Sequence, residues 1–171
     1  MASLPRKRIN AARPFASSSV DYCGPFTVRI GAKRSRATVK TYLAIFICMV
    51  AKAVHIEVVD DLSSQAFLDA FTRFVSRRGP CLELFSDNGP AFISANRLLQ
   101  EELVAWQNKG NQQSLANMGT HWHVITPSAT HQGGLWEAAA KSAKHHLVHL
   151  VGAQALWHSQ LQTLANGLRR A

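Results

Sequence analysis

Three carboxylate residues are this chain's strongest candidates for chemistry: Asp21, Asp87 and Glu137. The chain has only 10 acidic residues against 19 basic ones, so an acid that lies in or after an expected strand, or at an expected helix start, is informative. Asp21 lies within an apolar stretch, Asp87 follows another, and Glu137 stands where a helix is expected to start. If a sheet gathers these carboxylates, they form a site for two divalent cations, the arrangement that cuts and joins phosphodiester bonds.

The elements that must position these acids are visible in the hydrophobic pattern. The pattern predicts three strands, a helix, a strand, a helix, a strand and two helices, in that order. Ser63 and Ser94 are the expected N-caps of the first two helices, because a serine hydroxyl accepts a hydrogen bond from a free amide of the first turn. The expected strands cover residues 20–30, 38–49, 54–58, 81–85 and 122–125, and the third helix covers residues 132–151.

This order of elements is that of the ribonuclease-H-like fold, an α/β domain with a mixed five-stranded sheet and helices on both faces. We expect residues 1–17 to form a basic N-terminal arm and residues 18–171 to form this domain. In such a sheet the first strand is central and the fourth lies beside it, so Asp21 and Asp87 become neighbours. Open sheets place their sites at the carboxyl ends of parallel strands, and Glu137 is expected to reach the same place from its helix.

The three side chains favour Mg²⁺ or Mn²⁺ over zinc, because hard cations prefer oxygen ligands. Two carboxylates this close repel each other unless a cation lies between them. Taken singly, Asp87 also fits an ordinary Asp-Asn-Gly turn, and Glu137 fits a solvated helix position. Asp21 is harder to explain without a partner, because an acid inside an apolar strand is costly to bury.

Other polar residues are weaker candidates. His121 and His123 are two residues apart in an expected strand and so point the same way, but no third zinc ligand accompanies them. In residues 54–58, apolar side chains alternate with His55 and Glu57, which predicts a strand with one wetter face. Glu57 is therefore expected to be an exposed strand acid, with a fourth acid near the end of the sheet as the alternative.

Four motifs surround these positions: Val20-Asp21-Tyr22-Cys23-Gly24-Pro25-Phe26, Lys52-Ala53-Val54-His55-Ile56-Glu57, Ser86-Asp87-Asn88-Gly89 and Gly133-Gly134-Leu135-Trp136-Glu137-Ala138-Ala139. Together they resemble the catalytic core of a retroviral-type integrase, specifically that of a Bel/Pao-class LTR retrotransposon. The last motif is the most specific, because its pattern is rare outside these elements. The resemblance runs from about Leu4 to about Ala165. It carries the family's Asp-Asp-Glu triad onto Asp21, Asp87 and Glu137.

The resemblance implies DNA integration by a metal-dependent polynucleotidyl transferase with two Mg²⁺ or Mn²⁺ ions. Water would first trim the 3′ end of the element's DNA, and the freed 3′-hydroxyl would then attack a target phosphodiester. The implied partners are DNA and further copies of the chain, with no membrane. Action on chromosomal DNA implies a nuclear location, and a cytoplasmic virus-like particle is the alternative.

DNA-contacting residues are expected on the helix that carries Glu137. Lys141 and Lys144 follow it after four and seven residues, which places all three on one face. Integrases carry lysines at similar offsets, where they touch the DNA end. His145 extends this basic strip, with a solvated helix face as an equal alternative. Gln132 and the two glycines after it are expected to form a loop that approaches the substrate closely.

The chain departs from the family's pattern in three motifs, one of which is residues 166–171, where the family has Asn-Ser-Arg-Pro-Leu. Pro90-Ala91-Phe92 stands where related elements have Thr-Asn-Phe, and Thr130-His131-Gln132 stands where they have Pro-His-Phe. The second gap between triad positions is longer than in retroviral enzymes, and the expected loop over residues 108–120 absorbs the excess. These differences leave the triad intact but remove possible substrate contacts.

The composition fits a basic, folded domain. A net charge of +9 favours a nucleic-acid partner, with a simple solubility charge as the plain alternative, and 47% apolar residues exclude a disordered chain. Cys23, Cys48 and Cys81 lie in apolar runs, which predicts buried free thiols rather than disulfides or zinc ligands. The basic segment Pro5-Arg6-Lys7-Arg8 fits a solvated tail better than a nuclear-import signal.

Two rival functions remain open on the sequence. A non-catalytic DNA-binding or assembly module, descended from a retrotransposon integrase, would bind DNA in a salt-sensitive way without needing the carboxylates. A ribonuclease H proper would share the sheet and the metals, but its usual fourth acid is not evident in this sequence.

Overall fold

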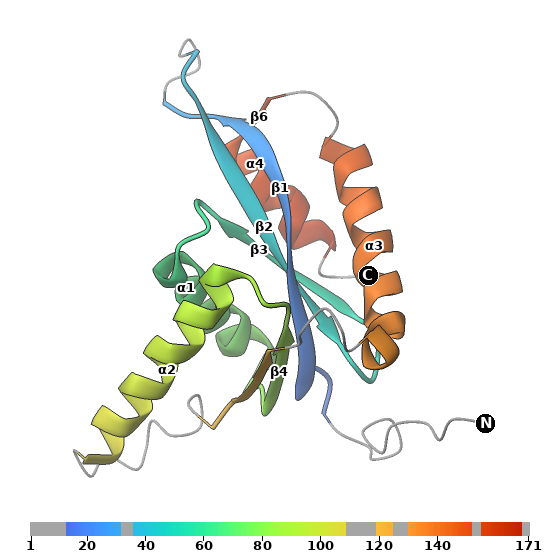
Figure 1. The fold of residues 1–171 in the computed structure, drawn as a ribbon. Helices are drawn as coiled ribbons and strands as arrows, with labels where there is room; N and C mark the ends of the chain where they lie inside the picture. Colours follow the sequence, from blue (N-terminus) through green and yellow to red (C-terminus); the bar gives the residue numbers. More distant parts are fainter. Residues whose placement is uncertain (1–12, 32–35, 109–118, 125–129, 152–154, 169–171) are drawn as a thin grey trace.

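The computed structural model describes residues 13–31, 36–108, 119–124, 130–151 and 155–168 (Figure 1). The expected arm up to residue 12 and most of the expected 108–120 loop lie outside these residues. The described elements are β1 (Ser17–Arg29), β2 (Thr38–Cys48), β3 (Val54–Val59), α1 (Ser64–Arg78), β4 (Glu83–Ser86), α2 (Pro90–Asn108), β5 (His121–Val124), α3 (Thr130–Val151), β6 (Leu156–Trp157) and α4 (His158–Leu168).

The strands form one mixed sheet in the order β3-β2-β1-β4-β5, and the two-residue β6 pairs with the far end of β1. β1 pairs antiparallel with β2 and parallel with β4, and β4 pairs parallel with β5. β1 is therefore central and β4 is its neighbour. The predicted ribonuclease-H-like arrangement is confirmed, and β6 is a short addition to it.

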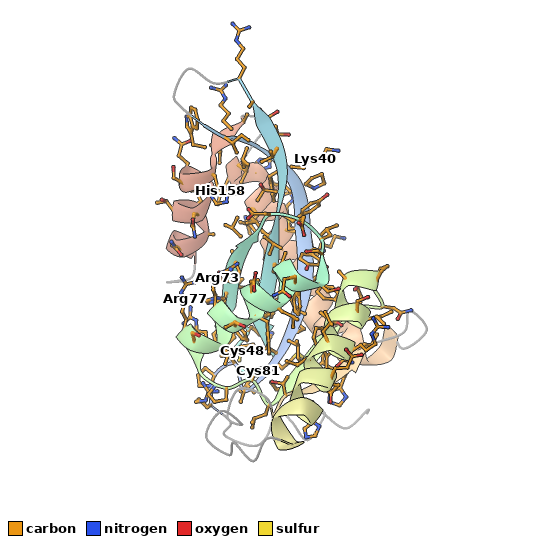
Figure 2. All side chains as sticks on the ribbon, turned by 90° about the vertical axis from the view of Figure 1, so that its left-hand side faces the viewer. Lys40, Cys48, Arg73, Arg77, Cys81 and His158 are labelled. Atoms are coloured by element: carbon orange, nitrogen blue, oxygen red, sulfur yellow. The ribbon has the colours of Figure 1, made fainter. Side chains whose placement is uncertain are left out.

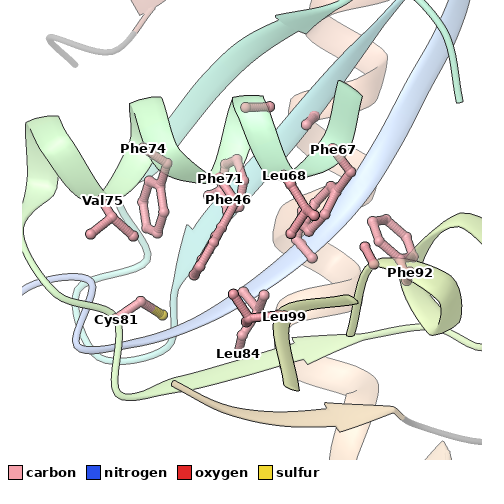
Figure 3. Close-up of a cluster of buried hydrophobic side chains, with 14 of the residues drawn as sticks. Phe46, Phe67, Leu68, Phe71, Phe74, Val75, Cys81, Leu84, Phe92 and Leu99 are labelled. Carbon is pink, nitrogen blue, oxygen red and sulfur yellow. The ribbon is translucent and has the colours of Figure 1, made fainter. Parts of the chain in front are cut away.

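Helices cover both faces of this sheet: α1 and α2 lie on one side, and α3 and α4 lie on the other (Figure 1). Under α1, aromatic rings from β2 and the helix fill the core (Figure 3), with the rings of Phe46 and Phe74 stacked at 4.2 Å. On the opposite face, Leu147, Val151 and Leu161 are buried in one cluster with side chains of β1, β2 and β3. Burying each large apolar side chain stabilises the fold by about 1.5–3 kcal/mol.

The ends of α1 follow the expected capping chemistry. The Ser63 Oγ accepts a hydrogen bond from the Ala66 amide at 3.2 Å, which confirms the predicted N-cap. Gly79 ends the helix at φ 83°, and its amide donates to the Val75 carbonyl at 2.7 Å.

The predicted start of the second helix at Ser94 is wrong, because α2 begins at Pro90. Proline suits the first position of a helix, where no intrahelical partner exists for an amide hydrogen. The Gly89 carbonyl accepts hydrogen bonds from the amides of Phe92 and Ile93 at 3.0 and 3.1 Å. The turn that contains Asp87 therefore leads directly into α2.

Two further local predictions are wrong. Gln132 and the glycines after it lie in the first turns of α3, which begins at Thr130, and not in a loop. His55 and Glu57 are buried and not on a wetter face. β3 is covered by α1 on that side and by α4 on the other, so both of its faces belong to the core.

The three cysteines are buried free thiols, as predicted. Burial raises the pKa of Cys81 to about 12 and also raises the pKa of Cys23. Packing at the amino-terminal end of the described chain begins before residue 18, since Phe15 and Ala16 are buried. Among the described residues, none of the helices combines the length and apolar character needed to cross a membrane.

Candidate functional site

Strand pairing places β1, which holds Asp21, beside β4, which Asp87 follows. β1 and β4 are parallel with Ser17 opposite Glu83 and Ser19 opposite Phe85. The hydrogen-bonded pairing ends there, and the same register continued for two residues aligns Asp21 with Asp87. Adjacent strands lie about 4.8 Å apart, so this continued register would place the two carboxylates at the same level. The strand order confirms that the central strand and the strand before Asp87 are neighbours, and the convergence of the two carboxylates stays a prediction.

Asp21 is partly exposed and has both carboxylate oxygens engaged. Its Oδ1 accepts a hydrogen bond from the Tyr22 amide at 2.7 Å. Its Oδ2 lies 2.5 Å from the Nζ of Lys144 on α3. The side chains of Lys144 and Asp21 are 34% and 37% exposed, so solvent reaches both ends of this ion pair. Asp21 thus escapes the cost of a buried unpaired charge, and it lies on the α3 side of the sheet.

Asp87 is exposed in the turn between β4 and α2. Its Oδ1 accepts a hydrogen bond from the Gly89 amide at 2.9 Å. A Cβ atom on Gly89 would lie 3.0 Å from that same oxygen and 3.3 Å from the Phe92 ring. The glycine therefore fixes the carboxylate through its backbone, and a side chain at this position would crowd the carboxylate.

Two acids in turns, Asp61 and Asp87, affect the pKa of Tyr22 in the central strand. Burial raises the pKa of the Tyr22 phenol well above its ordinary range, and the negative charges of Asp61 and Asp87 raise that pKa further. The Tyr22 ring lies on the α1 side of the sheet, stacked on Phe92 at 4.8 Å, whereas Asp21 faces α3 on the other side. Asp61, just before α1, was not singled out by its sequence. Its pKa is lowered by hydrogen bonds from Ser63.

α3 contains the third predicted acid, Glu137, and lies alongside β1. The helix runs beside β1 in the same direction (Figure 1), and Leu147 and Val151 are buried with Cys23 and Val28 of β1. Glu137 precedes Lys144 by seven residues, about 10 Å along the helix axis and on nearly the same face.

Lysine side chains on a helix lean toward its N-terminus, which brings the Lys144 ammonium back toward the turn of Glu137. The side chain of Glu137 lies outside the described residues. Its convergence with the two aspartates therefore stays a prediction. The position of α3 beside β1 is compatible with it.

The predicted nucleic-acid contacts also lie on α3. Lys141 is exposed, and Lys144 is the partner of Asp21. His145 is exposed, and its ring stacks on that of His149 with centroids 5.4 Å apart. Gln132 lies in the first turn of the helix, and its side chain is outside the described residues. The helix thus presents one exposed lysine, Lys141, and a second lysine, Lys144, that contacts Asp21 of β1.

The described side chains give no support to a zinc site at His121 and His123. Both belong to β5, and no three His, Cys, Asp or Glu side chains among the described residues gather closely enough to hold a metal ion. His123 stacks on Phe85 at 4.7 Å, and its Nε2 lies 4.0 Å from a carboxylate oxygen of Glu83.

A buried charge cluster on the opposite side of the sheet was missed by the sequence analysis. Glu57, with a side chain 2% exposed, accepts from Arg73 at 3.0 Å and from Arg77 at 2.5 Å, and its Oε1 lies 2.7 Å from His55. Arg78 donates to the Nδ1 of His55 at 3.1 Å. Figure 2 labels Arg73 and Arg77 on α1. The i, i+4 spacing of these two arginines was the signal available in the sequence.

No protein-family profile matches this chain, and no curated protein matches it. Solved structures do. A chain of the simian T-cell lymphotropic virus intasome is 14% identical, with a TM-score of 0.56 over 89% of this chain and 47% of that one. The HTLV-2 integrase catalytic core, solved with magnesium in a trimeric form, is 19% identical with a TM-score of 0.54 over 91% of this chain and 83% of that one.

The BIV integrase catalytic core is also 19% identical, with a TM-score of 0.54 over 88% of this chain and 80% of that one. The chain therefore spans about half of the intasome chain and most of each isolated core. At these identities the likeness shows the fold alone, which is that of retroviral integrase catalytic cores.

Proposed function

We propose that this chain is an integrase catalytic core, a Mg²⁺- or Mn²⁺-dependent polynucleotidyl transferase that trims 3′ ends and joins element DNA to target DNA. The observation that carries the proposal is the parallel pairing of β1 with β4, whose register, if continued two residues past its last pair, would bring Asp21 opposite Asp87 beside the helix of Glu137. The fold shared with retroviral integrase cores supports this assignment.

The donor set at this place suits hard divalent cations, since Asp21 and Asp87 offer carboxylate oxygens. An HTLV-2 integrase core was solved with magnesium, which supports the same choice of ion. In our proposal, Asp21, Asp87 and Glu137 hold two ions between them. When bound, such ions activate an attacking oxygen and stabilise the leaving one in an in-line displacement.

The chain's own residues would bind and orient the DNA. The Gly89 amide holds the Asp87 carboxylate in place from the backbone. Lys141 and Lys144 offer ammonium groups for phosphates of the DNA end, with Gln132 and His145 as further contacts on α3. No protein nucleophile is needed, because water and the DNA 3′-hydroxyl supply the attacking oxygens.

The proposal also covers the class of element, the cellular location and the oligomeric state. The motifs around Asp21, Asp87 and Glu137 favour a Bel/Pao-class LTR retrotransposon as the source, with action on chromosomal DNA in the nucleus. We further propose a homo-oligomer, and the trimeric form of the HTLV-2 core supports assembly of such domains. The net charge of +9 supports DNA as the partner.

The test is a strand-transfer assay in both directions. Folded protein with Mn²⁺ is given a branched DNA that mimics the joined product, together with a blunt-ended duplex. We expect resolution of the branched DNA, and we expect Asp21→Asn, Asp87→Asn and Glu137→Gln each to abolish it without changing the circular dichroism spectrum. Asp69→Asn is the matched control, because Asp69 is an exposed acid of α1 that accepts only a local hydrogen bond from Gln65 among the described contacts.

The same assay separates the rival functions. Salt-sensitive DNA binding that persists in all three variants, without any metal-dependent reaction in the wild type, would favour the non-catalytic DNA-binding module. Cleavage of an RNA–DNA hybrid in preference to branched DNA would favour a ribonuclease H.

A further inference from the structure

The ion pair between Asp21 and Lys144 places a cation of the protein at a carboxylate that we assign to metal binding. The Nζ of Lys144 lies 2.5 Å from the Asp21 Oδ2, and the other oxygen accepts the Tyr22 amide hydrogen at 2.7 Å. An ammonium group at this distance occupies the lone pairs that a divalent cation would use. Two positive charges on one carboxylate oxygen also repel each other. Lys144 and a divalent cation are therefore competitors for Asp21.

We propose that Lys144 is the built-in counter-ion of Asp21, that a divalent cation displaces it, and that the released ammonium then binds a DNA phosphate. This inference rests on the proposed function and adds an order of events to it. Cation binding comes first and makes a phosphate-binding group available.

The exposure of the pair makes this exchange feasible. Both side chains are about one third exposed, so the ammonium can leave Asp21 without crossing the apolar core. Lys144 lies at the border between the buried face of α3, marked by Leu147 and Val151, and its exposed face, marked by Lys141 and His145. A lysine stem has enough rotatable bonds to move its charge from the carboxylate to the exposed face.

The expected change in cation affinity follows from the free energy that partly exposed ion pairs contribute. Such pairs are worth at most about 1 kcal/mol, which corresponds to about a fivefold change in an equilibrium constant. Removing the charge of Lys144 should therefore tighten cation binding by about two- to fivefold. In the wild type, cation binding should also add about one phosphate contact. Such a contact steepens the salt dependence of DNA binding by about 0.9 in the logarithmic slope.

Calorimetric measurement of Mn²⁺ affinity on the full chain tests the first half of the proposal without any reliance on activity. Lys144→Met keeps the aliphatic stem and removes the charge, so it should bind Mn²⁺ about two- to fivefold more tightly than the wild type. Lys144→Arg keeps a cation and should behave as the wild type. Lys40→Met is the matched control, since Lys40 is an exposed lysine of β2 that pairs with Thr27, six positions along β1 from Asp21, and has no ion pair among the described residues, and it should leave the affinity unchanged.

Asp21→Asn separates failure of this inference from failure of the proposed function. If Asp21→Asn weakens Mn²⁺ binding while Lys144→Met leaves it unchanged or weaker, the cation site stands and the competition is refuted. If no variant alters Mn²⁺ binding, or the wild type binds none, the proposed cation site itself fails.

Fluorescence anisotropy of a labelled duplex tests the second half. The slope of log affinity against log salt is measured with and without Mn²⁺ for the wild type and for Lys144→Met. Mn²⁺ should steepen the slope by about 0.9 more in the wild type than in Lys144→Met, and this comparison cancels the screening of DNA by Mn²⁺ itself. Equal effects of Mn²⁺ in the two proteins would refute the transfer of Lys144 to DNA.

Discussion

Replacing Glu57 by glutamine should destabilise the protein strongly, although the residue lies in an edge strand of the sheet. Its carboxylate is almost fully buried and has Arg73, Arg77 and His55 around it. Glutamine keeps the shape but turns an acceptor-only group into one with amide donors. Its NH₂ group would then face the donating arginines.

The magnitude follows from how exposed each partner is. The side chains of Arg73 and Arg77 are 39% and 45% exposed, so water can solvate them again and each lost pair costs no more than about 1 kcal/mol. His55 is fully buried, and the single carbonyl oxygen of glutamine cannot replace both carboxylate oxygens, so setting the new NH₂ group against the buried donors costs about 1–3 kcal/mol. The total loss is about 1–5 kcal/mol, which lowers the Tm by about 2–20 °C for a domain of this size.

Thermal unfolding followed by circular dichroism provides the measurement. Glu101→Gln is the matched control, because Glu101 makes an exposed i, i+4 pair with Arg97 at 3.6 Å and should show no measurable shift. A Glu57→Gln variant that unfolds within about 1 °C of the wild type would refute the reasoning. An equal loss in Glu101→Gln would refute it as well, since burial would then not matter.

Three further predictions concern the site and its supports. Gly89→Ala should weaken Mn²⁺ binding several-fold with little loss of Tm, because the new Cβ meets the Asp87 carboxylate at 3.0 Å; calorimetry showing wild-type affinity would contradict this. Ser63→Ala should cost about 1 kcal/mol and lower the Tm by about 2–4 °C through loss of the N-cap, and an unchanged Tm would count against the cap. Burial raises the pKa of Cys81 to about 12, so the native state favours the protonated thiol. The stabilisation that this thiol contributes is fully present below its unfolded-state pKa, and it is lost as the pH rises toward about 12. When the pH is raised from 8 to 10.5, the Tm of Cys81→Ala should therefore fall less than the Tm of the wild type.

The sequence predicts the fold well because its signals are local and periodic. The apolar runs of β1, β2 and β4 and the capped, amphipathic α1 define the element order, and the order defines the topology. The local failures have physical causes. Ser94 is an acceptable cap, but Pro90 starts α2 four residues earlier because its missing amide hydrogen costs nothing there. The glycines before Glu137 were expected in a loop, yet α3 already covers them.

Long-range pairing is what the sequence did not reveal. Alternation of His55 and Glu57 with valine and isoleucine indicates a strand with one polar face, but only the fold shows that α1 brings arginines to cover that face. The contact between Lys144 and Asp21 likewise depends on how α3 lies along β1. The sequence predicts the three-acid site from the order of the elements and from the motif resemblance, and the adjacency of β1 and β4 supports the placement of two of its members.

Anomalous diffraction from crystals grown with Mn²⁺ tests the central claim most directly. The account predicts two Mn²⁺ ions about 3.5–4 Å apart, with carboxylate oxygens of Asp21, Asp87 and Glu137 as their ligands and Lys144 moved away from Asp21. Mn²⁺ bound elsewhere, or a Glu137 side chain pointing away from the two aspartates, would contradict it.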